Sequence, residues 1–118
     1  MAIETVIGRY KNAIEDVVIE ISTVENLNAV EGSDVSGEVT FKGETLGCRG
    51  NVRLDKGGAP ASLALFVQDY FGSDQRFGCA GAFNISDGAL TGALVMANLH
   101  AQESFLVGYE WGGIWQKE

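Results

Sequence analysis

The chain has few of the residues on which catalytic and metal-binding proteins depend. Its 118 residues include one histidine, His100, and two cysteines, Cys48 and Cys79. Two cysteines are too few for a disulfide scaffold, and these two lack the spacing of a metal site. Few charges flank either thiol, and no serine or cysteine has a local sequence typical of activation by His100. We therefore expect no catalytic residue, no metal and no cofactor, and hence no enzyme activity.

The chain also lacks a long hydrophobic run and an excess of basic residues. No apolar segment approaches the roughly 18 residues that span a membrane, and the opening MAIETVIGRYK lacks the layout of a signal peptide. We expect a soluble protein without a membrane partner, cytoplasmic rather than secreted. Sixteen acidic residues against eight basic ones give a net charge of −8. Because phosphate contacts need clustered Lys and Arg, this balance argues against a nucleic-acid partner.

Proline occurs once, at Pro60, whereas glycine occurs sixteen times, which favours closely spaced strands over long helices. Apolar and polar residues alternate in runs separated by turn-type segments such as DKGGAPA and SDG. Links this short permit only antiparallel pairing of neighbouring strands. The predicted strands cover residues 16–23, 34–43, 45–54, 62–71, 75–86, 89–99 and 103–113.

The N-terminal run, residues 2–15, fits two structures. Ile3, Val6, Tyr10 and other apolar residues follow a helical stripe, whereas Gly8 interrupts that stripe and favours a strand. Counted as a strand, the run brings the total to eight, the number at which an antiparallel sheet can close with room for side chains or one small ligand. We therefore predict an all-β fold, an eight-stranded antiparallel up-and-down β-barrel, as a single domain over residues 1–118.

Five short segments resemble, in order, motifs of the avidin and streptavidin family. GRYKN at 8–12 resembles the family's opening Gly-x-Trp-x-Asn, with tyrosine at the aromatic position. SGEVT at 36–40 resembles a third-strand motif, and FGCAGAF at 77–83 resembles the sixth-strand aromatic-x-Gly run. VMANL and LVGYE are similar to the Met-Trp-x-Leu-like and Arg-Val-Gly-x-Asn-like segments of the last two strands. The resemblance covers roughly residues 6–115 and implies the family's barrel topology.

The resemblance also implies a ligand site at one mouth of the barrel. Asn12 matches the family's asparagine, Asp16 falls at its serine position, and Glu110 falls at a hydrogen-bonding position of the last strand. We expect a small ligand near these three residues and Phe41. Other biotin-contacting positions are not matched, so a biotin head group would be left with unpaired polar atoms. We therefore predict a ligand other than biotin. The unmatched positions carry Val39, Asp69 and Ala97.

The segment 62–71 is apolar on both faces, with Leu63 and Leu65 on one and Ala64 and Phe66 on the other. A strand that is apolar on both faces is covered on both, and a barrel has one layer. A second copy of the chain would supply the outer cover, so we expect a homo-oligomer, a dimer or tetramer. The alternative is that residues 2–15 form a helix across that outer face.

The avidin-like register implies an unexpected orientation for the side chains of the last predicted strand. It places Gly108 and Glu110 inside the barrel and Val107 and Tyr109 outside, on a face that lies between subunits in that family. The interface predicted from this register comprises Met96, Val107, Tyr109 and Trp111.

Two functions follow from these patterns. The first is a non-catalytic, avidin-like barrel that binds a small molecule and assembles with copies of itself. The alternative is an acidic inhibitor or immunity-type protein that binds a basic protein partner, which the net charge of −8 would favour.

Overall fold

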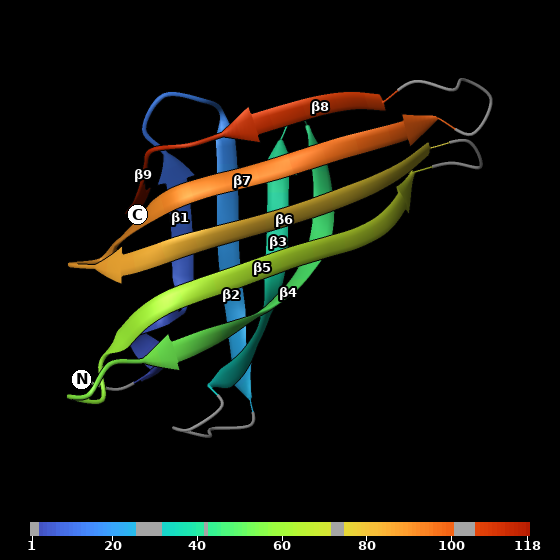
Figure 1. Ribbon diagram of the computed structural model, residues 1–118. Helices are drawn as coiled ribbons and strands as arrows, with labels where there is room; N and C mark the ends of the chain where they lie inside the picture. Colours follow the sequence, from blue (N-terminus) through green and yellow to red (C-terminus); the bar gives the residue numbers. More distant parts are fainter. Residues whose placement is uncertain (1–2, 26–31, 42, 72–74, 101–105) are drawn as a thin grey trace.

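Each strand of this chain pairs with its neighbour in antiparallel register, as the alternating pattern predicted (Figure 1). The computed structural model describes residues 3–25, 32–41, 43–71, 75–100 and 106–118. Side chains are described for residues 5–25, 32–41, 43, 45–66, 80–95 and 110–118. The elements are η1 (Ile3–Val6), β1 (Gly8–Asn12), β2 (Val17–Glu25), β3 (Ser33–Phe41), β4 (Glu44–Leu54), β5 (Pro60–Phe71), β6 (Gln75–Ser86), β7 (Ala89–His100), β8 (Leu106–Trp111) and β9 (Ile114–Lys117).

The sheet closes on itself through the C-terminal strand. β7 pairs with β8 along one part of its length and with β9 along another, where Leu90 lies opposite Trp115. β9 also pairs with β1, where Asn12 lies opposite Trp115, so the two ends of the chain meet in the wall. β8 and β9 together form the eighth strand of the barrel and are separated at Gly112 and Gly113. Gly113 adopts a φ of 97°, which favours glycine. The fold is therefore the predicted eight-stranded antiparallel closed β-barrel.

The N-terminal run divides into a short 3-10 turn, η1, and the strand β1. Val6 and Tyr10 are both buried in the core, and the Tyr10 hydroxyl donates a hydrogen bond of 2.6 Å to the carbonyl oxygen of Val6. Of the two structures considered for residues 2–15, the described residues adopt the strand, because Gly8–Asn12 is one strand of the barrel wall. No helix in the described part of the chain is long and apolar enough to cross a membrane.

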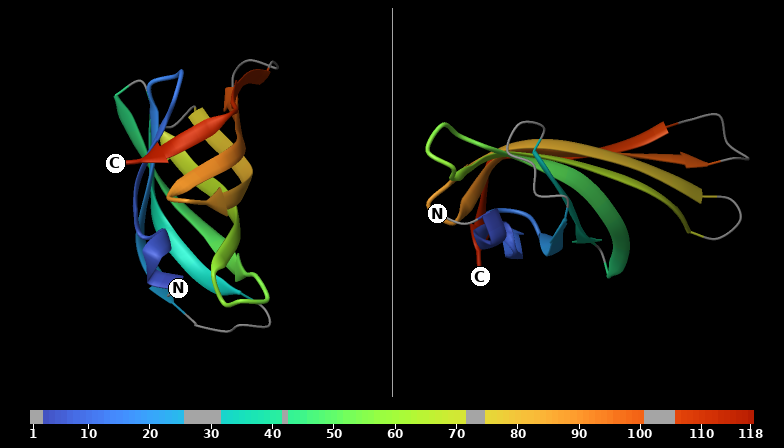
Figure 2. Two further views of the ribbon diagram at one scale, coloured as in Figure 1. Left: turned by 90° about the vertical axis from the view of Figure 1, so that its left-hand side faces the viewer. Right: turned by 90° about the horizontal axis from the view of Figure 1, so that it is seen from below.

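The two ends of the barrel differ. Strands β5–β8 cross β1–β4 steeply and run on past them at one end (Figure 2). Pairing between β4 and β5 extends from Leu54↔Pro60 to Arg49↔Phe66, and β5 continues from there with β6 as its partner. We call this end, which carries the β1–β2 and β3–β4 turns, the splayed end. The opposite end, with η1 and the β4–β5 and β6–β7 turns, is the closed end.

The described interior is filled by large side chains. Trp115 is fully buried, its ring lies edge-on to Phe83 at 5.8 Å, and its indole nitrogen donates to the carbonyl oxygen of Gly92. Glycines stand where strands approach closely, and a Cβ on Gly50 would collide with the carbonyl oxygen of Ala64 on β5. The buried core also includes Ile19, Ile21, Val39, Leu46, Val52, Leu63, Leu65, Leu90 and Leu94.

Candidate functional site

Asn12 lies at the splayed end, where the chain's own backbone engages its amide. The side-chain nitrogen donates to the carbonyl oxygen of Gly112 at 3.1 Å. The side-chain oxygen accepts hydrogen bonds of 2.9 Å from the backbone amides of Ile14 and Glu15. Asn12 is 3% exposed, so these bonds satisfy a buried polar group, hold the β1–β2 turn and join it to the break between β8 and β9.

Two further predicted ligand residues lie at the same end. Phe41 is opposite Val17 in the β2–β3 ladder, and Asp16 immediately precedes Val17, so both lie beside the β1–β2 turn. Asp16 is exposed, whereas Phe41 is buried with its ring centroid 5.3 Å from that of Trp111. The structure therefore brings Asn12, Asp16 and Phe41 to one end of the barrel.

Glu110, the fourth predicted ligand residue, does not join them. It is exposed on the outer face of β8, opposite Val95 of β7, which is also exposed. The prediction that Glu110 points into the barrel is therefore wrong. Trp111 occupies the inward position instead, opposite the buried Leu94, because the core takes up the bulky ring and leaves the carboxylate in water.

The same reversal applies to the predicted interface. Trp111 is 7% exposed and packs against Phe41, so the prediction that it lies on the outer surface is wrong. The side chains of Met96, Val107 and Tyr109 lie outside the described residues. Their backbones are described, and Met96 pairs with Tyr109 in the β7–β8 ladder.

A different part of the outer wall is apolar and uncovered. On β5, Leu63 and Leu65 face the core, while Ala64 and Phe66 face outward, and Phe66 is 53% exposed. Val95 on β7 is 51% exposed. We call the apolar outward-facing residues described on β5, β6 and β7 the outer apolar face. Its members are Ala64, Phe66, Ala80, Ala82, Ala93 and Val95.

No described segment covers this face. The alternative cover considered from the sequence was an N-terminal helix, but η1 and β1 belong to the closed end and to the wall itself. The barrel has one layer, and the outward side chains described on β5–β7, such as Phe66 and Val95, are exposed in a single copy of the chain. The apolar alternation on both faces of residues 62–71 was the signal that pointed to this surface.

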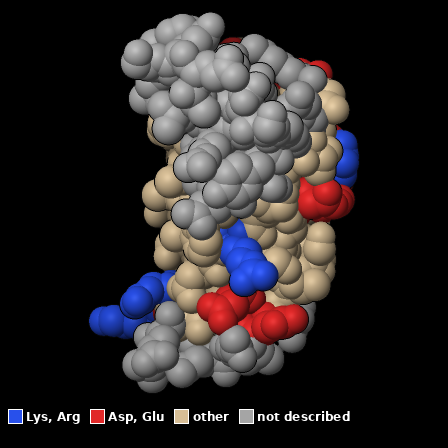
Figure 3. All heavy atoms as spheres, turned by 90° about the vertical axis from the view of Figure 1, so that its right-hand side faces the viewer, with Lys and Arg blue, Asp and Glu red and all other residues tan. Residues whose placement is uncertain are grey.

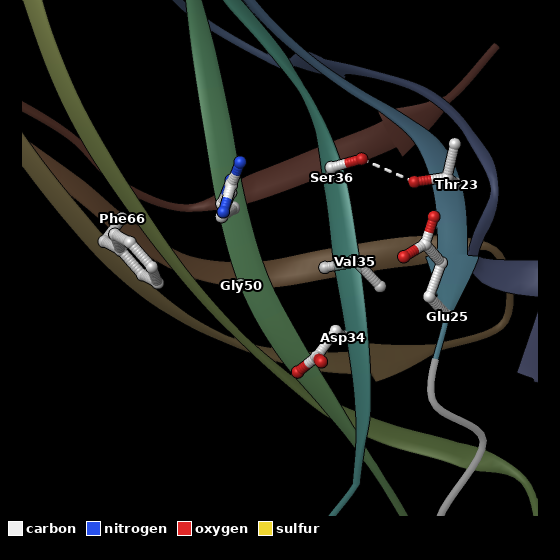
Figure 4. A pocket seen from close by; sticks show the side chains of 8 residues that line it. Thr23, Glu25, Asp34, Val35, Ser36, Gly50 and Phe66 are labelled. Carbon is white, nitrogen blue, oxygen red and sulfur yellow. Dashed lines mark hydrogen bonds between the residues drawn. The ribbon is translucent and has the colours of Figure 1, made fainter.

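Two hollows adjoin the outer apolar face. The first, of about 500 Å³, lies over β2–β5, with Phe66 on one side and Thr23 and Glu25 on the other (Figure 4). The second, of about 460 Å³, lies over β4–β7, where the small side chains of Ala64 and Ala82 form part of its floor. Small outward side chains thus leave shallow depressions on the outer surface of the barrel, which a partner surface could fill.

Charge on the described surface is dispersed. On the side of the molecule shown in Figure 3, acidic and basic side chains are scattered among uncharged ones, and in one place a basic side chain lies against acidic ones. Among the described residues, the one ion pair is Arg9–Glu118 at 3.3 Å, between side chains that are half exposed. No group of three or more potential metal ligands occurs in the described part of the chain.

The one described thiol is buried and unreactive. Cys48 faces the core from β4 as a free cysteine. Burial raises its pKa to about 11, the nearby Glu38 carboxylate adds to the rise, and a hydrogen bond with the backbone of Gly37 opposes it. A thiol with that pKa stays protonated at neutral pH, so it is a poor nucleophile and packs as a small apolar side chain.

Comparison with known proteins adds no relative to this description. No model of a protein family, no curated protein and no solved structure matches the chain.

Proposed function

We propose that this chain is a non-catalytic binding protein that works as a homo-oligomer, with the outer apolar face of β5–β7 lying between copies. The observation that carries the proposal is the exposure of Phe66 and Val95, each more than half exposed, among alanines on adjoining strands. Contiguous apolar surface rimmed by polar residues is typical of protein interaction sites. The protonated thiol of Cys48 also supports a binding rather than a catalytic role.

The same proposal includes a small ligand, other than biotin, held at the splayed end of an avidin-like barrel. It is supported by the gathering of Asn12, Asp16 and Phe41 at that end and by the end of β4–β5 pairing at Arg49↔Phe66. The exposed Asp16 carboxylate is an acceptor available there, whereas Asn12 is engaged by backbone groups. A ligand with a donor group and an apolar body would suit this combination.

Sedimentation velocity over a range of protein concentrations tests the assembly. We expect the native chain to form a dimer or tetramer, and Phe66→Thr and Val95→Thr to weaken association by about tenfold or more. Ile14→Thr is the matched control, because Ile14 is 85% exposed but lies on the β1–β2 turn away from the outer apolar face. A native chain that stays monomeric at every concentration, or equal effects of all three variants, would overturn the assembly.

A thermal-shift screen of small metabolites, with biotin included, tests the ligand separately. We expect at least one compound other than biotin to raise the melting temperature of the native chain, and Asp16→Asn to reduce that rise. If no compound raises the melting temperature, the ligand part of the proposal fails while the assembly stands on its own measurement.

A further inference from the structure

One row of outward side chains crosses the barrel wall at right angles to the strands. The ladder pairs are Arg49↔Phe66, Phe66↔Ala80, Ala80↔Val95 and Val95↔Glu110, so one residue from each of β4–β8 lies in line. We call these five residues the central row. All five are exposed.

The central row is graded in size and charge from its middle to its ends. Ala80 stands at the centre on β6, Phe66 and Val95 flank it, and the charged Arg49 and Glu110 end it. The wall of a closed barrel curves away on both sides of any strand. A second surface laid against β6 would therefore meet a short side chain at the centre and need progressively longer ones at the flanks, which is the order found here.

We infer that a second copy of this chain packs on the outer apolar face about a twofold axis that runs along β6. This inference rests on the homo-oligomer proposed above and names its geometry. The axis exchanges the two halves of the central row, so Ala80 faces Ala80 of the partner subunit and Phe66 faces Val95 of the partner subunit. Arg49 then lies opposite Glu110 of the partner subunit, and the symmetry forms this ion pair twice.

Charge favours this axis over a twofold axis along the central row, which would also bring the same faces together. An axis along the central row would place each Arg49 against Arg49 of the partner subunit, which is a like-charge contact. Among the described residues no ion pair involves Arg49 or Glu110, so both charges are available to a partner.

The neighbouring row lets the two sheets approach. Asn51, Ala64, Ala82 and Ala93 lie in line beside the central row, and three of these four side chains end at Cβ. Facing sheets ordinarily pack about 10 Å apart with their strands within about 30° of each other. Alanine on both sides favours a close spacing of the two sheets, which is consistent with β6 running parallel to β6 of the partner subunit about this axis.

The available area suits a stable dimer. β5, β6 and β7 each have 12 residues. At the usual spacings, these three strands cover about 15 Å by about 40 Å, a footprint of about 600 Å². Two copies would bury about 1,200 Å² in total, at the lower end of the range for specific interfaces.

Charge reversal with compensation tests the axis. We expect Arg49→Glu and Glu110→Arg each to weaken the dimer by about tenfold or more, because each replaces two ion pairs by two like-charge contacts. The double variant R49E/E110R restores both pairs with their polarity exchanged, so we expect its dissociation constant to return to within about threefold of the native value. Sedimentation equilibrium measures the constants, and circular dichroism verifies that each variant is folded.

Two controls match the change in net charge. Lys11→Glu alters the charge by the same amount as Arg49→Glu on β1, away from β5–β7. Glu38→Arg does the same for Glu110→Arg on β3, away from β5–β7. Both should weaken association by less than about threefold, because they act only through long-range charge.

The outcomes separate this inference from the proposed function. Two results would overturn the axis while leaving the homo-oligomer, provided that Phe66→Thr disrupts the dimer. In the first, both charge reversals leave the dimer unchanged. In the second, the double variant fails to restore it. A native chain that is monomeric at every concentration overturns both.

Discussion

The inner face of β5–β7 and the outer apolar face on the same strands are built from apolar side chains of different size. The inner face presents leucine and phenylalanine, each 4% exposed or less. The outer face presents mainly alanine, with Phe66 and Val95 as its two large members. The inner residues are Leu63, Leu65, Phe83, Leu90 and Leu94.

This difference indicates that the inner face contributes to the folding equilibrium of the monomer and the outer apolar face to the association equilibrium. Large inward side chains remove apolar surface from water when one chain folds, so they contribute to the free energy of unfolding of the monomer. Outward alanines, Phe66 and Val95 stay in water after folding and would gain a partner only on association. Substitutions on the two faces should therefore separate into those that change folding and those that change assembly.

Adjacent residues on β7 give the largest expected contrast. Leu94 is fully buried, and Leu94→Ala should lower the free energy of unfolding by about 3 kcal/mol, because it removes buried methyl groups and leaves a cavity. Val95 points the other way and is half exposed, so Val95→Ala should cost less than about 1 kcal/mol. Urea denaturation at a concentration where the chain is monomeric measures both. Equal losses would contradict the assignment of faces.

Two glycines on β4 differ in the same way, because the backbone of a neighbouring strand lies close to one of them and not to the other. At the inward position Gly50, a Cβ would meet the carbonyl oxygen of Ala64 and the side chain of Leu65, so Gly50→Ala should cost about 2 kcal/mol. At the exposed Gly47 a Cβ would meet no atom within 4 Å, so Gly47→Ala should change stability by less than about 0.5 kcal/mol or increase it. Thermal unfolding of the two variants, compared with the native chain, makes the test.

Much of this fold was accessible from alternation and turn residues. The predicted strand at 75–86 coincides with β6, and the strand at 45–54 differs from β4 by one residue. Alternation also identified residues 62–71 as apolar on both faces, which Leu65 and Phe66 confirm. Such patterns succeed because burial on one side of a strand imposes a period of two directly on the sequence.

For the last strand, the sequence did not predict which face points into the barrel. Trp111 and Glu110 differ by one position, and a shift of one residue exchanges the two faces of a whole strand. The avidin-like register put Glu110 inside, whereas pairing with β7 puts Trp111 opposite the buried Leu94. The closing strand β9 was also missed, because its four residues follow two glycines and show too short an alternation.

The buried thiol of Cys48 should make the free energy of unfolding depend on pH. Because burial raises the pKa of Cys48 from 9.0 to about 11, the unfolded chain loses this proton at lower pH than the folded chain. The free energy of unfolding should therefore fall as pH rises from about 9 to about 11, by about 1 kcal/mol at pH 10 from this group. Cys48→Ala should lack that component of the decline. The slopes of stability against pH for the two proteins, from urea denaturation, provide the comparison.

The smallest expected effect is on the folding of a variant that should change assembly strongly. Phe66→Thr replaces one residue of high strand propensity by another and removes a ring that is already half exposed, so the monomer should lose less than about 0.5 kcal/mol. The neighbouring Leu65→Thr places a hydroxyl in the core and should cost several times more. Urea denaturation of dilute monomer measures the folding term, and sedimentation measures the assembly term. A Phe66→Thr monomer as unstable as the Leu65→Thr monomer would show that the Phe66 ring belongs to the fold of the single chain, and would remove it from the proposed interface.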